Sequence, residues 1–291
     1  MRLQRGDVLL GDGAWGTMLM QRGLRAGEPP DMACISQPGA IEEIAALYLE
    51  SGAEIITTNT FGASPLKLQM FGLDERTEEI NRKSVEAARR AVGTRACVSA
   101  SVGPTGRLLK PYGDVEAGEV QAGFERQVRA LAEAGADLIC VETMTDLAEA
   151  VLAVQAARAV APAAPVMATV TFEATPRGFR TIMGVTVEQA AAGLEEAGAD
   201  ILGSNCGNGI ETMIEIAREF RRHSRLPVAI QSNAGLPALR SGILIYPESP
   251  EFMAERVPQL LAAGVQIIGG CCGTTPAHIA ALRKTIDSSR Q

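Results

Sequence analysis

The stretch Gly269-Gly270-Cys271-Cys272-Gly273-Thr274-Thr275 places two adjacent thiols between glycines. It follows the short apolar run 265–268 and precedes a helical pattern that starts near Pro276. An apolar run, a glycine-rich turn and a helix in this order are typical of a strand–helix unit in a parallel sheet. The two cysteines are therefore predicted to lie where a strand ends and a helix begins.

A third cysteine, Cys206, occupies an equivalent place. It follows the run 200–202, sits among glycines, and precedes a helical pattern from Ile210. Zinc takes cysteine sulfur in tetrahedral geometry, and catalytic zinc sites keep one position open for substrate. Three thiols at strand ends, Cys206, Cys271 and Cys272, therefore predict a three-thiolate metal site with an open fourth position.

Two other interpretations of these cysteines stay open. They can be small buried residues, because free cysteine is among the most buried residue types. Cys271 and Cys272 can also form a vicinal disulfide, although disulfides are rare in reducing compartments. Their spacing is not that of a zinc finger. The other three cysteines, Cys34, Cys97 and Cys140, fall in a long loop or inside predicted strands, and we expect them to be inert structural residues.

Short apolar runs alternate with longer helical patterns along the whole chain. Four glycines (52, 135, 198 and 264) each follow a predicted helix and precede a predicted strand, as helix C-terminal signals do. Eight such units predict an α/β fold of the (β/α)8 TIM barrel type, with a doubly wound sheet as the alternative. No linker-like composition divides the chain, so we expect one domain over residues 1–291. The expected strands are 8–11, 55–58, 97–102, 138–142, 166–172, 201–204, 228–232 and 265–269, and the expected helices are 40–51, 75–91, 117–134, 146–159, 187–197, 211–222, 250–263 and 276–286.

Composition excludes several classes of function. The chain is 46% hydrophobic but only 4% aromatic, so small and aliphatic side chains must fill the core. Its net charge of −7 argues against a nucleic-acid or anionic-membrane partner. We find no signal peptide and no apolar segment long enough to span a bilayer. With six cysteines in a chain of this kind, we expect a cytoplasmic protein with reduced thiols.

The unusual polar segments follow the predicted strands, whereas the loops before the strands carry only Gly, Ala and Pro punctuation. In a barrel, the loops after the strands form the C-terminal face, where active sites lie. Asp12 and Glu142 end the first and fourth strands, and acids in such places are functional more often than structural. They can alternatively cap helices or pair with arginine.

The chemistry of a three-thiolate zinc site narrows the reaction. Such a site carries a net charge of −1 and is a poor Lewis acid toward a carbonyl, so hydrolysis is not its natural task. Zinc deprotonates a coordinating thiol, and the thiolate is the nucleophilic form of sulfur. The site therefore predicts alkyl transfer to a substrate sulfur. Asp12 and Glu142 would suit an ammonium group on that substrate, which indicates a small amino-thiol acceptor.

Several motifs at the predicted strand ends occur together: Gly-Asp-Gly-Ala-Trp-Gly-Thr at 11–17, Thr-Asn-Thr-Phe-Gly-Ala at 58–63, Gly-Pro-Thr-Gly at 103–106, Glu-Thr at 142–143, Asn-Cys at 205–206, Asn-Ala-Gly-Leu-Pro at 233–237 and Gly-Gly-Cys-Cys-Gly-Thr at 269–274. With them, nearly the whole chain resembles the homocysteine S-methyltransferase family. The resemblance is nearest to the homocysteine-binding barrel module of cobalamin-dependent methionine synthase.

The resemblance implies that zinc held by Cys206, Cys271 and Cys272 activates the thiol of homocysteine, and that methionine is the product. It also implies where the amino-acid end of homocysteine lies. The residues expected there are Asp12, Gly13, Ala14, Glu142 and Asn233.

For the methyl donor we expect a methylated corrinoid (methylcobalamin) carried by a separate protein. Betaine-using members of the family carry a tryptophan in the loop after the first strand, where the stretch 26–30 has no aromatic residue. A cationic methyl group favours an aromatic cage, and Trp15 is expected to pack instead. Alternatives are the same acceptor with S-methylmethionine, S-adenosylmethionine or betaine as donor, and a non-catalytic zinc or redox-sensing barrel. A closed structural site would need a fourth protein ligand, and no nearby Cys or His is placed to supply it.

Overall fold

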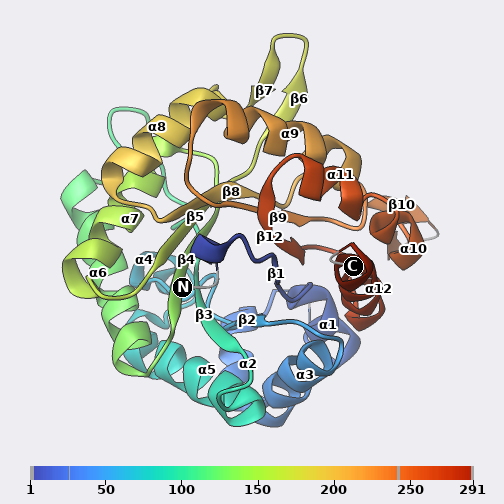
Figure 1. Ribbon diagram of the computed structural model, residues 1–291. Helices are drawn as coiled ribbons and strands as arrows, with labels where there is room; N and C mark the ends of the chain where they lie inside the picture. Colours follow the sequence, from blue (N-terminus) through green and yellow to red (C-terminus); the bar gives the residue numbers. More distant parts are fainter. Residues whose placement is uncertain (1–2, 26, 241–242, 290–291) are drawn as a thin grey trace.

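Eight parallel strands form a barrel at the centre of the protein (Figure 1). The computed structural model describes residues 3–25, 27–240 and 243–289. The strands lie side by side in the order β1-β12-β9-β8-β5-β4-β3-β2, and Gly11 forms a parallel bridge to Ile55 that joins the two ends of this order. The strands are β1 (Leu9–Leu10), β2 (Ile55–Thr57), β3 (Cys97–Val102), β4 (Leu138–Met144), β5 (Val166–Val170), β8 (Ile201–Asn205), β9 (Val228–Ser232) and β12 (Val265–Gly270).

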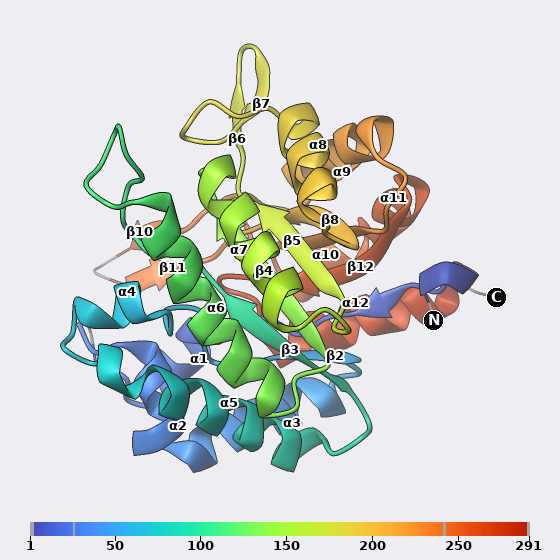
Figure 2. The ribbon, with the colours of Figure 1, turned by 90° about the vertical axis from the view of Figure 1, so that its left-hand side faces the viewer.

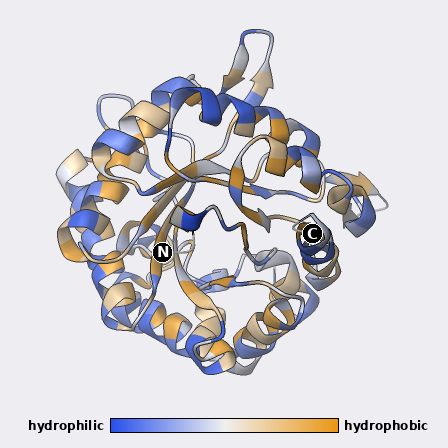
Figure 3. Cartoon of the chain, in the orientation of Figure 1, coloured by the Kyte–Doolittle hydropathy of each residue, from blue (hydrophilic) through white to orange (hydrophobic). Residues whose placement is uncertain are grey.

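Helices surround the barrel and turn their apolar sides toward it. In Figure 3 the strands are mostly orange, whereas the helices alternate orange and blue around their circumference. This is the pattern of helices that bury one face and expose the other. The main helices are α3 (Pro38–Glu50), α5 (Thr77–Val92), α6 (Ala117–Glu133), α7 (Leu147–Val160), α8 (Val187–Ala197), α9 (Ile210–His223), α10 (Pro250–Ala254), α11 (Val257–Ala262) and α12 (Pro276–Ser288), and the shorter ones are η1 (Leu3–Arg5), α1 (Gly16–Gln21), η2 (Pro30–Met32), α2 (Ala33–Ser36), α4 (Pro65–Gln69) and η3 (Asp74–Arg76).

The structure confirms the TIM barrel and all eight expected strands. The single helix expected over 250–263 is wrong, because the segment forms two helices, α10 and α11. The second begins at Val257-Pro258, and proline is favoured in the first turn of a helix because its missing N–H is not needed there. Two hairpins were not foreseen. They are formed by β6 (Glu173–Thr175) with β7 (Gly178–Arg180), and by β10 (Ala238–Arg240) with β11 (Ile243–Ile245).

The inside of the barrel changes from apolar to polar along its axis. At the N-terminal end, Leu3 of η1 packs against an apolar cluster inside the barrel, and Gln266 Nε2 donates a hydrogen bond to the Leu3 carbonyl at 2.9 Å. In Figure 2 both termini lie at this end, on the right, and the two hairpins lie toward the opposite end. The cluster consists of Ile55, Leu138, Cys140, Met167, Ile201, Ala229 and Ile267, with Leu9 and Cys97 beside it.

The three cysteines expected to be structural lie away from the C-terminal ends of the strands. Cys34 and Cys140 are buried and Cys97 is half-buried. Burial raises the pKa of Cys34 and of Cys97 to about 12, so both remain unreactive thiols, as expected. Within the described part of the chain, no helix has both the length and the hydropathy needed to cross a membrane.

Candidate active site

The three cysteines at the strand ends come together at the C-terminal end of the barrel. Their sulfur atoms all lie within 4.8 Å of one another, and Cys206 Sγ lies 3.8 Å from Cys272 Sγ. A disulfide would need about 2.05 Å, and all three are free thiols, so the vicinal disulfide is not formed. Zinc–sulfur bonds of about 2.3 Å in a tetrahedral site separate two sulfurs by about 3.8 Å. The cluster therefore has the composition and the spacing of a zinc site.

The backbone at Cys206 is held in an uncommon conformation. Its φ is +61°, and that of Gly207 is +74°. The Cys206 N–H donates to the Gln231 carbonyl at 3.1 Å, and the Asn208 N–H donates to the Cys206 carbonyl at 2.8 Å. A non-glycine residue with positive φ persists only where its surroundings hold it, and such residues concentrate at functional sites. The turn after β8 thus brings this thiol to those that follow β12.

The turn that carries Cys271 and Cys272 is bonded to loops on both sides. The Ala234 N–H donates to the Cys272 carbonyl at 3.0 Å. Thr274 Oγ1 donates to the Cys271 carbonyl at 2.7 Å and accepts from the Ala14 N–H at 3.2 Å. These bonds fix the ends of β1, β9 and β12 relative to one another.

The thiols of the cluster share their protons unequally. Cys271 and Cys272 both donate to Cys206, so the pKa of Cys206 lies well below its ordinary value. The same donation, together with burial, raises the pKa of Cys271 and of Cys272. One negative charge is therefore concentrated at Cys206. A cation bound by all three sulfurs would displace the remaining protons, because coordinated thiols are deprotonated.

Tyr246 is a neighbour of the cluster that the sequence analysis missed. Its hydroxyl donates to the Cys272 sulfur, and its ring lies on Gly273, where an added Cβ would come within 2.1 Å of a ring carbon. Burial and the nearby thiols raise the pKa of Tyr246 to about 12, so it remains a neutral donor. It lies in an irregular segment between β11 and α10, where no motif marks it.

Asp12 is buried and already well supplied with hydrogen bonds. Its Oδ2 accepts from the Thr57 N–H at 2.7 Å and from Trp15 Nε1 at 2.9 Å, and its Oδ1 accepts from Thr57 Oγ1 at 2.8 Å. Burial raises the pKa of Asp12 to about 6, against the effect of these donors. Trp15 packs on the core as expected, but it also holds this carboxylate, which the sequence did not indicate.

Glu142 lies at the same end of the barrel and has fewer partners. Ser101 Oγ donates to its Oε1, and Asn205 Nδ2 donates to its Oε2 at 3.2 Å. Burial raises the pKa of Glu142 to about 7, and the charges of Asp12 and Cys206 act in the same direction. A positive group bound here would offset three negative groups at once, which an ammonium ion could do.

The other three predicted substrate residues border the same space. Gly13 and Ala14 lie between β1 and α1, and the Ala14 carbonyl accepts from the Tyr48 hydroxyl at 2.8 Å. Asn233 is 4% exposed, and its side chain donates to Cys206. Within the described residues, Asn233 Oδ1 has no hydrogen-bond partner. A buried acceptor without a partner costs about 1–3 kcal/mol, so a bound cation or ammonium group would be stabilised there.

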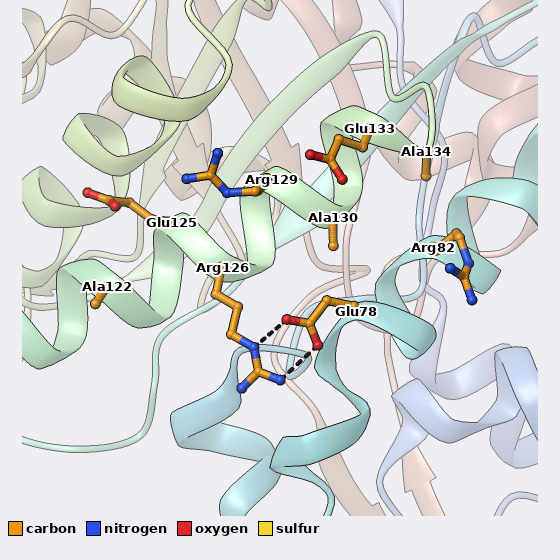
Figure 4. A pocket seen from close by; sticks show the side chains of 9 residues that line it. All are labelled: Glu78, Arg82, Ala122, Glu125, Arg126, Arg129, Ala130, Glu133 and Ala134. Carbon is orange, nitrogen blue, oxygen red and sulfur yellow. Dashed lines mark hydrogen bonds and ion pairs between the residues drawn. The ribbon is translucent and has the colours of Figure 1, made fainter.

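A groove on the outer surface, between α5 and α6, has no such chemistry (Figure 4). Arg126 Nη2 donates to Glu78 Oε2 across it at 2.7 Å, so two of its charges neutralise each other. It lies on the helix layer rather than at the strand ends and contains no thiol. Its lining consists of Glu78, Arg82, Ala122, Glu125, Arg126, Arg129, Ala130, Glu133 and Ala134.

Comparison with known proteins gives one consistent result. A family model described as homocysteine S-methyltransferase matches residues 9–286. A methionine synthase from Mycobacterium tuberculosis is 34% identical over 94% of this chain, and one from Mycobacterium leprae is 32% identical over 94%. The chain spans about a quarter of the length of these two curated relatives, 24% in each case.

Solved structures agree with this result. The metallated form of the homocysteine methyltransferase MmuM from Escherichia coli superposes with a TM-score of 0.81 at 28% identity, covering 97% of each chain. Its oxidized form gives a TM-score of 0.79 at 29% identity, covering 99% of this chain and 98% of the other.

The two buried carboxyl groups predict a contribution to the stability of the metal-free protein that falls as the pH rises. Their pKa values are about 7 for Glu142 and about 6 for Asp12 in the folded state, against ordinary values of 4.5 and 3.8. At these two groups the folded state binds more protons than the unfolded state between these values, so their contribution to the free energy of unfolding falls as pH rises through them. The lowered pKa of Cys206 acts in the opposite direction over this range, so the contribution of a carboxyl group is measured as a difference between two proteins that both keep the thiol cluster.

Glu142→Gln provides the control for this prediction. The variant lacks the larger of the two carboxyl titrations and keeps the thiols, so subtracting its free energy of unfolding from that of the wild type cancels the thiol contribution. In urea unfolding with a chelator present, this difference should fall by roughly 2–3 kcal/mol from pH 5 to pH 8. An unchanged pH dependence in Glu142→Gln would contradict the assignment.

Proposed function

This chain belongs to the homocysteine S-methyltransferase family, and we propose that it transfers a methyl group to the thiol of homocysteine, giving methionine. The observation that carries the proposal is the cluster of Cys206, Cys271 and Cys272 at the end of the barrel where two buried carboxyl groups also lie. Thiolates that hold a metal suit a thiol substrate, and the carboxyl groups suit its ammonium group. We propose that residues 1–291 act as one homocysteine-binding module.

We assign zinc to the three thiols. Three protein ligands leave one tetrahedral position for the substrate, which distinguishes this arrangement from a closed structural site. Within the described residues, no fourth cysteine, histidine or carboxylate joins the cluster. Zinc held by these three residues would stabilise an incoming thiol as its thiolate, which is the nucleophilic form of sulfur, at neutral pH. The cluster requires reduced thiols, which supports a cytoplasmic location.

The carboxyl groups and the loop after β1 would orient the substrate. Glu142 accepts the ammonium group, and Asp12, held by Thr57 and Trp15, adds a fixed negative charge beside it. The amino-acid end then lies near Gly13, Ala14 and Asn233. Because both ends of homocysteine are held, its sulfur faces the mouth of the barrel at the point from which a methyl group arrives.

We propose a methylated corrinoid as the donor, presented by another protein or module. The two curated relatives named above are methionine synthases, and the stretch 27–30 offers no aromatic side chain for a cationic methyl group; residue 26, an alanine, lies outside the described residues. In Figure 1, which looks along the barrel, both hairpins lie outside the ring of strands. A corrinoid would supply the methyl group for the new carbon–sulfur bond and would retain the electron pair of the bond that breaks, so no residue of this chain would need to protonate the leaving group.

Replacing Cys206 by Ala should remove zinc and activity together. The side chain lies at a strand end outside the apolar clusters, so the barrel should stay folded by circular dichroism. Zinc content after gel filtration and methionine formation measure the two losses. Cys97→Ala, at the opposite end of the barrel, is the matched control and should keep both. Full zinc occupancy in folded Cys206→Ala protein would refute the ligand assignment.

Glu142→Gln should weaken homocysteine binding by ten- to a hundredfold while zinc stays bound. The change removes a charge-assisted hydrogen bond worth about 1.5–3 kcal/mol. Calorimetric titration should show that 4-mercaptobutanoate, which lacks the amine, binds both proteins equally. Glu173→Gln, on the exposed hairpin β6–β7, is the control. Unchanged homocysteine affinity, or loss of zinc, would show that Glu142 does not hold the amine.

The donor assignment predicts a specific order of activities. Zinc-loaded protein with homocysteine should form methionine slowly from free methylcobalamin and not at all from methyltetrahydrofolate alone. Chromatographic detection of methionine measures both. Faster turnover with S-methylmethionine, S-adenosylmethionine or betaine than with methylcobalamin would refute the corrinoid assignment and identify the faster compound as the donor.

A further inference from the structure

Asn205, at the end of β8, uses its whole side chain to connect three strands. It is fully buried, with 0% of its surface exposed. Its Oδ1 accepts from the Thr143 N–H at 2.7 Å and from Thr169 Oγ1 at 2.8 Å, and its Nδ2 donates to Thr143 Oγ1 at 2.7 Å and to Glu142 Oε2 at 3.2 Å. An amide offers two donors and two acceptor positions, and all four are in use. The backbone donor of Thr143 also defines which end of the amide is oxygen.

The residue that Asn205 holds most closely has a strained backbone. Thr143 has a φ of +59°, which is a genuine outlier for a β-branched residue. Such a conformation persists only where neighbouring groups over-determine it. Asn205 bonds both the backbone and the side chain of Thr143, and this pair of bonds supplies that restraint.

The strained turn directly follows Glu142, whose carboxylate has two anchors. Ser101 donates to one oxygen and Asn205 to the other. Without Asn205, the carboxylate would keep only the Ser101 contact and could rotate about it, and the Thr143 turn would be free to relax. Cys206, the next residue in the chain, ties the same segment to the thiol cluster.

We propose that Asn205 is the positioning residue for the Glu142 carboxylate. Its amide holds the turn at 142–143 and aims the carboxylate at the ammonium group of the substrate. This role rests on the assignment of Glu142 under the proposed function. Asn205 itself does not contact the reacting sulfur or the methyl group.

The test compares two thiols on zinc-loaded protein. Asn205→Ala should weaken homocysteine binding about tenfold in calorimetric titration while changing 4-mercaptobutanoate binding less than twofold. In the Glu142→Gln background, adding Asn205→Ala should change homocysteine binding less than twofold, since residues that act as a unit are not additive. Ser204→Ala is the matched control. Ser204 is equally buried on the same strand, but its hydroxyl donates to the Val170 carbonyl at 2.7 Å, and its removal should leave the ratio of the two affinities unchanged.

A second variant tests the same proposal if Asn205→Ala does not fold. Asn205→Asp keeps the size and the acceptor for the Thr143 N–H but loses the donor to Glu142, and it should lower the preference for homocysteine over 4-mercaptobutanoate in the same way. Equal weakening of both thiols in the folded variants, or full additivity with Glu142→Gln, would overturn the positioning role alone. A Glu142→Gln protein with unchanged homocysteine affinity would instead overturn the amine assignment, and this proposal with it.

Discussion

The arrangement of the site depends on the central position of β9 between the two strands that carry the thiols. β8 and β12 both pair with β9 in parallel register. The Gln231 carbonyl at its end accepts from the Cys206 N–H, and the adjacent Ser232 carbonyl accepts from the Cys271 N–H. Thiols that are 65 residues apart in the chain therefore meet because one strand end bonds to both turns. A shift of register on either side would move one sulfur away from the others.

A second constraint is electrostatic. Asp12, Glu142 and Cys206 collect negative charge in a region from which water is largely excluded, and burial raises the pKa of both carboxyl groups. Without a ligand, the repulsion among these buried negative groups lowers the stability of the folded protein. A ligand that carries a positive charge would offset this repulsion. Binding strength is thus obtained at the expense of the stability of the free protein, as is common for functional sites. The confinement of these groups to one end of the barrel leaves the aliphatic packing elsewhere undisturbed.

The sequence predicted the barrel well because the signals for it are local. Each strand is a short apolar run, each helix has its own period, and glycines mark the junctions. The strand ends in turn predicted that Cys206, Cys271 and Cys272 meet, and the family comparison confirms the family that the motifs indicated. The contacts of Asn205 and Tyr246 were not predicted, because each bond crosses to a distant part of the chain and leaves no local pattern. The bond from Trp15 to Asp12 spans only three residues, but it depends on the turn after β1, which the sequence pattern does not define. The two hairpins and the break between α10 and α11 were also not predicted, because each is defined by only a few residues of strand pairing or turn.

The apolar cluster that Leu3 closes has a kinetic consequence. Because apolar side chains fill one end of the barrel, the molecules of the proposed reaction would use the opposite end, where the thiol cluster lies. A methyl donor as large as the proposed corrinoid carrier would cover that opening while it delivers the methyl group. With such a donor, homocysteine would have to enter before the carrier docks, and methionine would leave after the carrier has withdrawn. The closed end among the described residues would thus impose an order of binding on the proposed reaction.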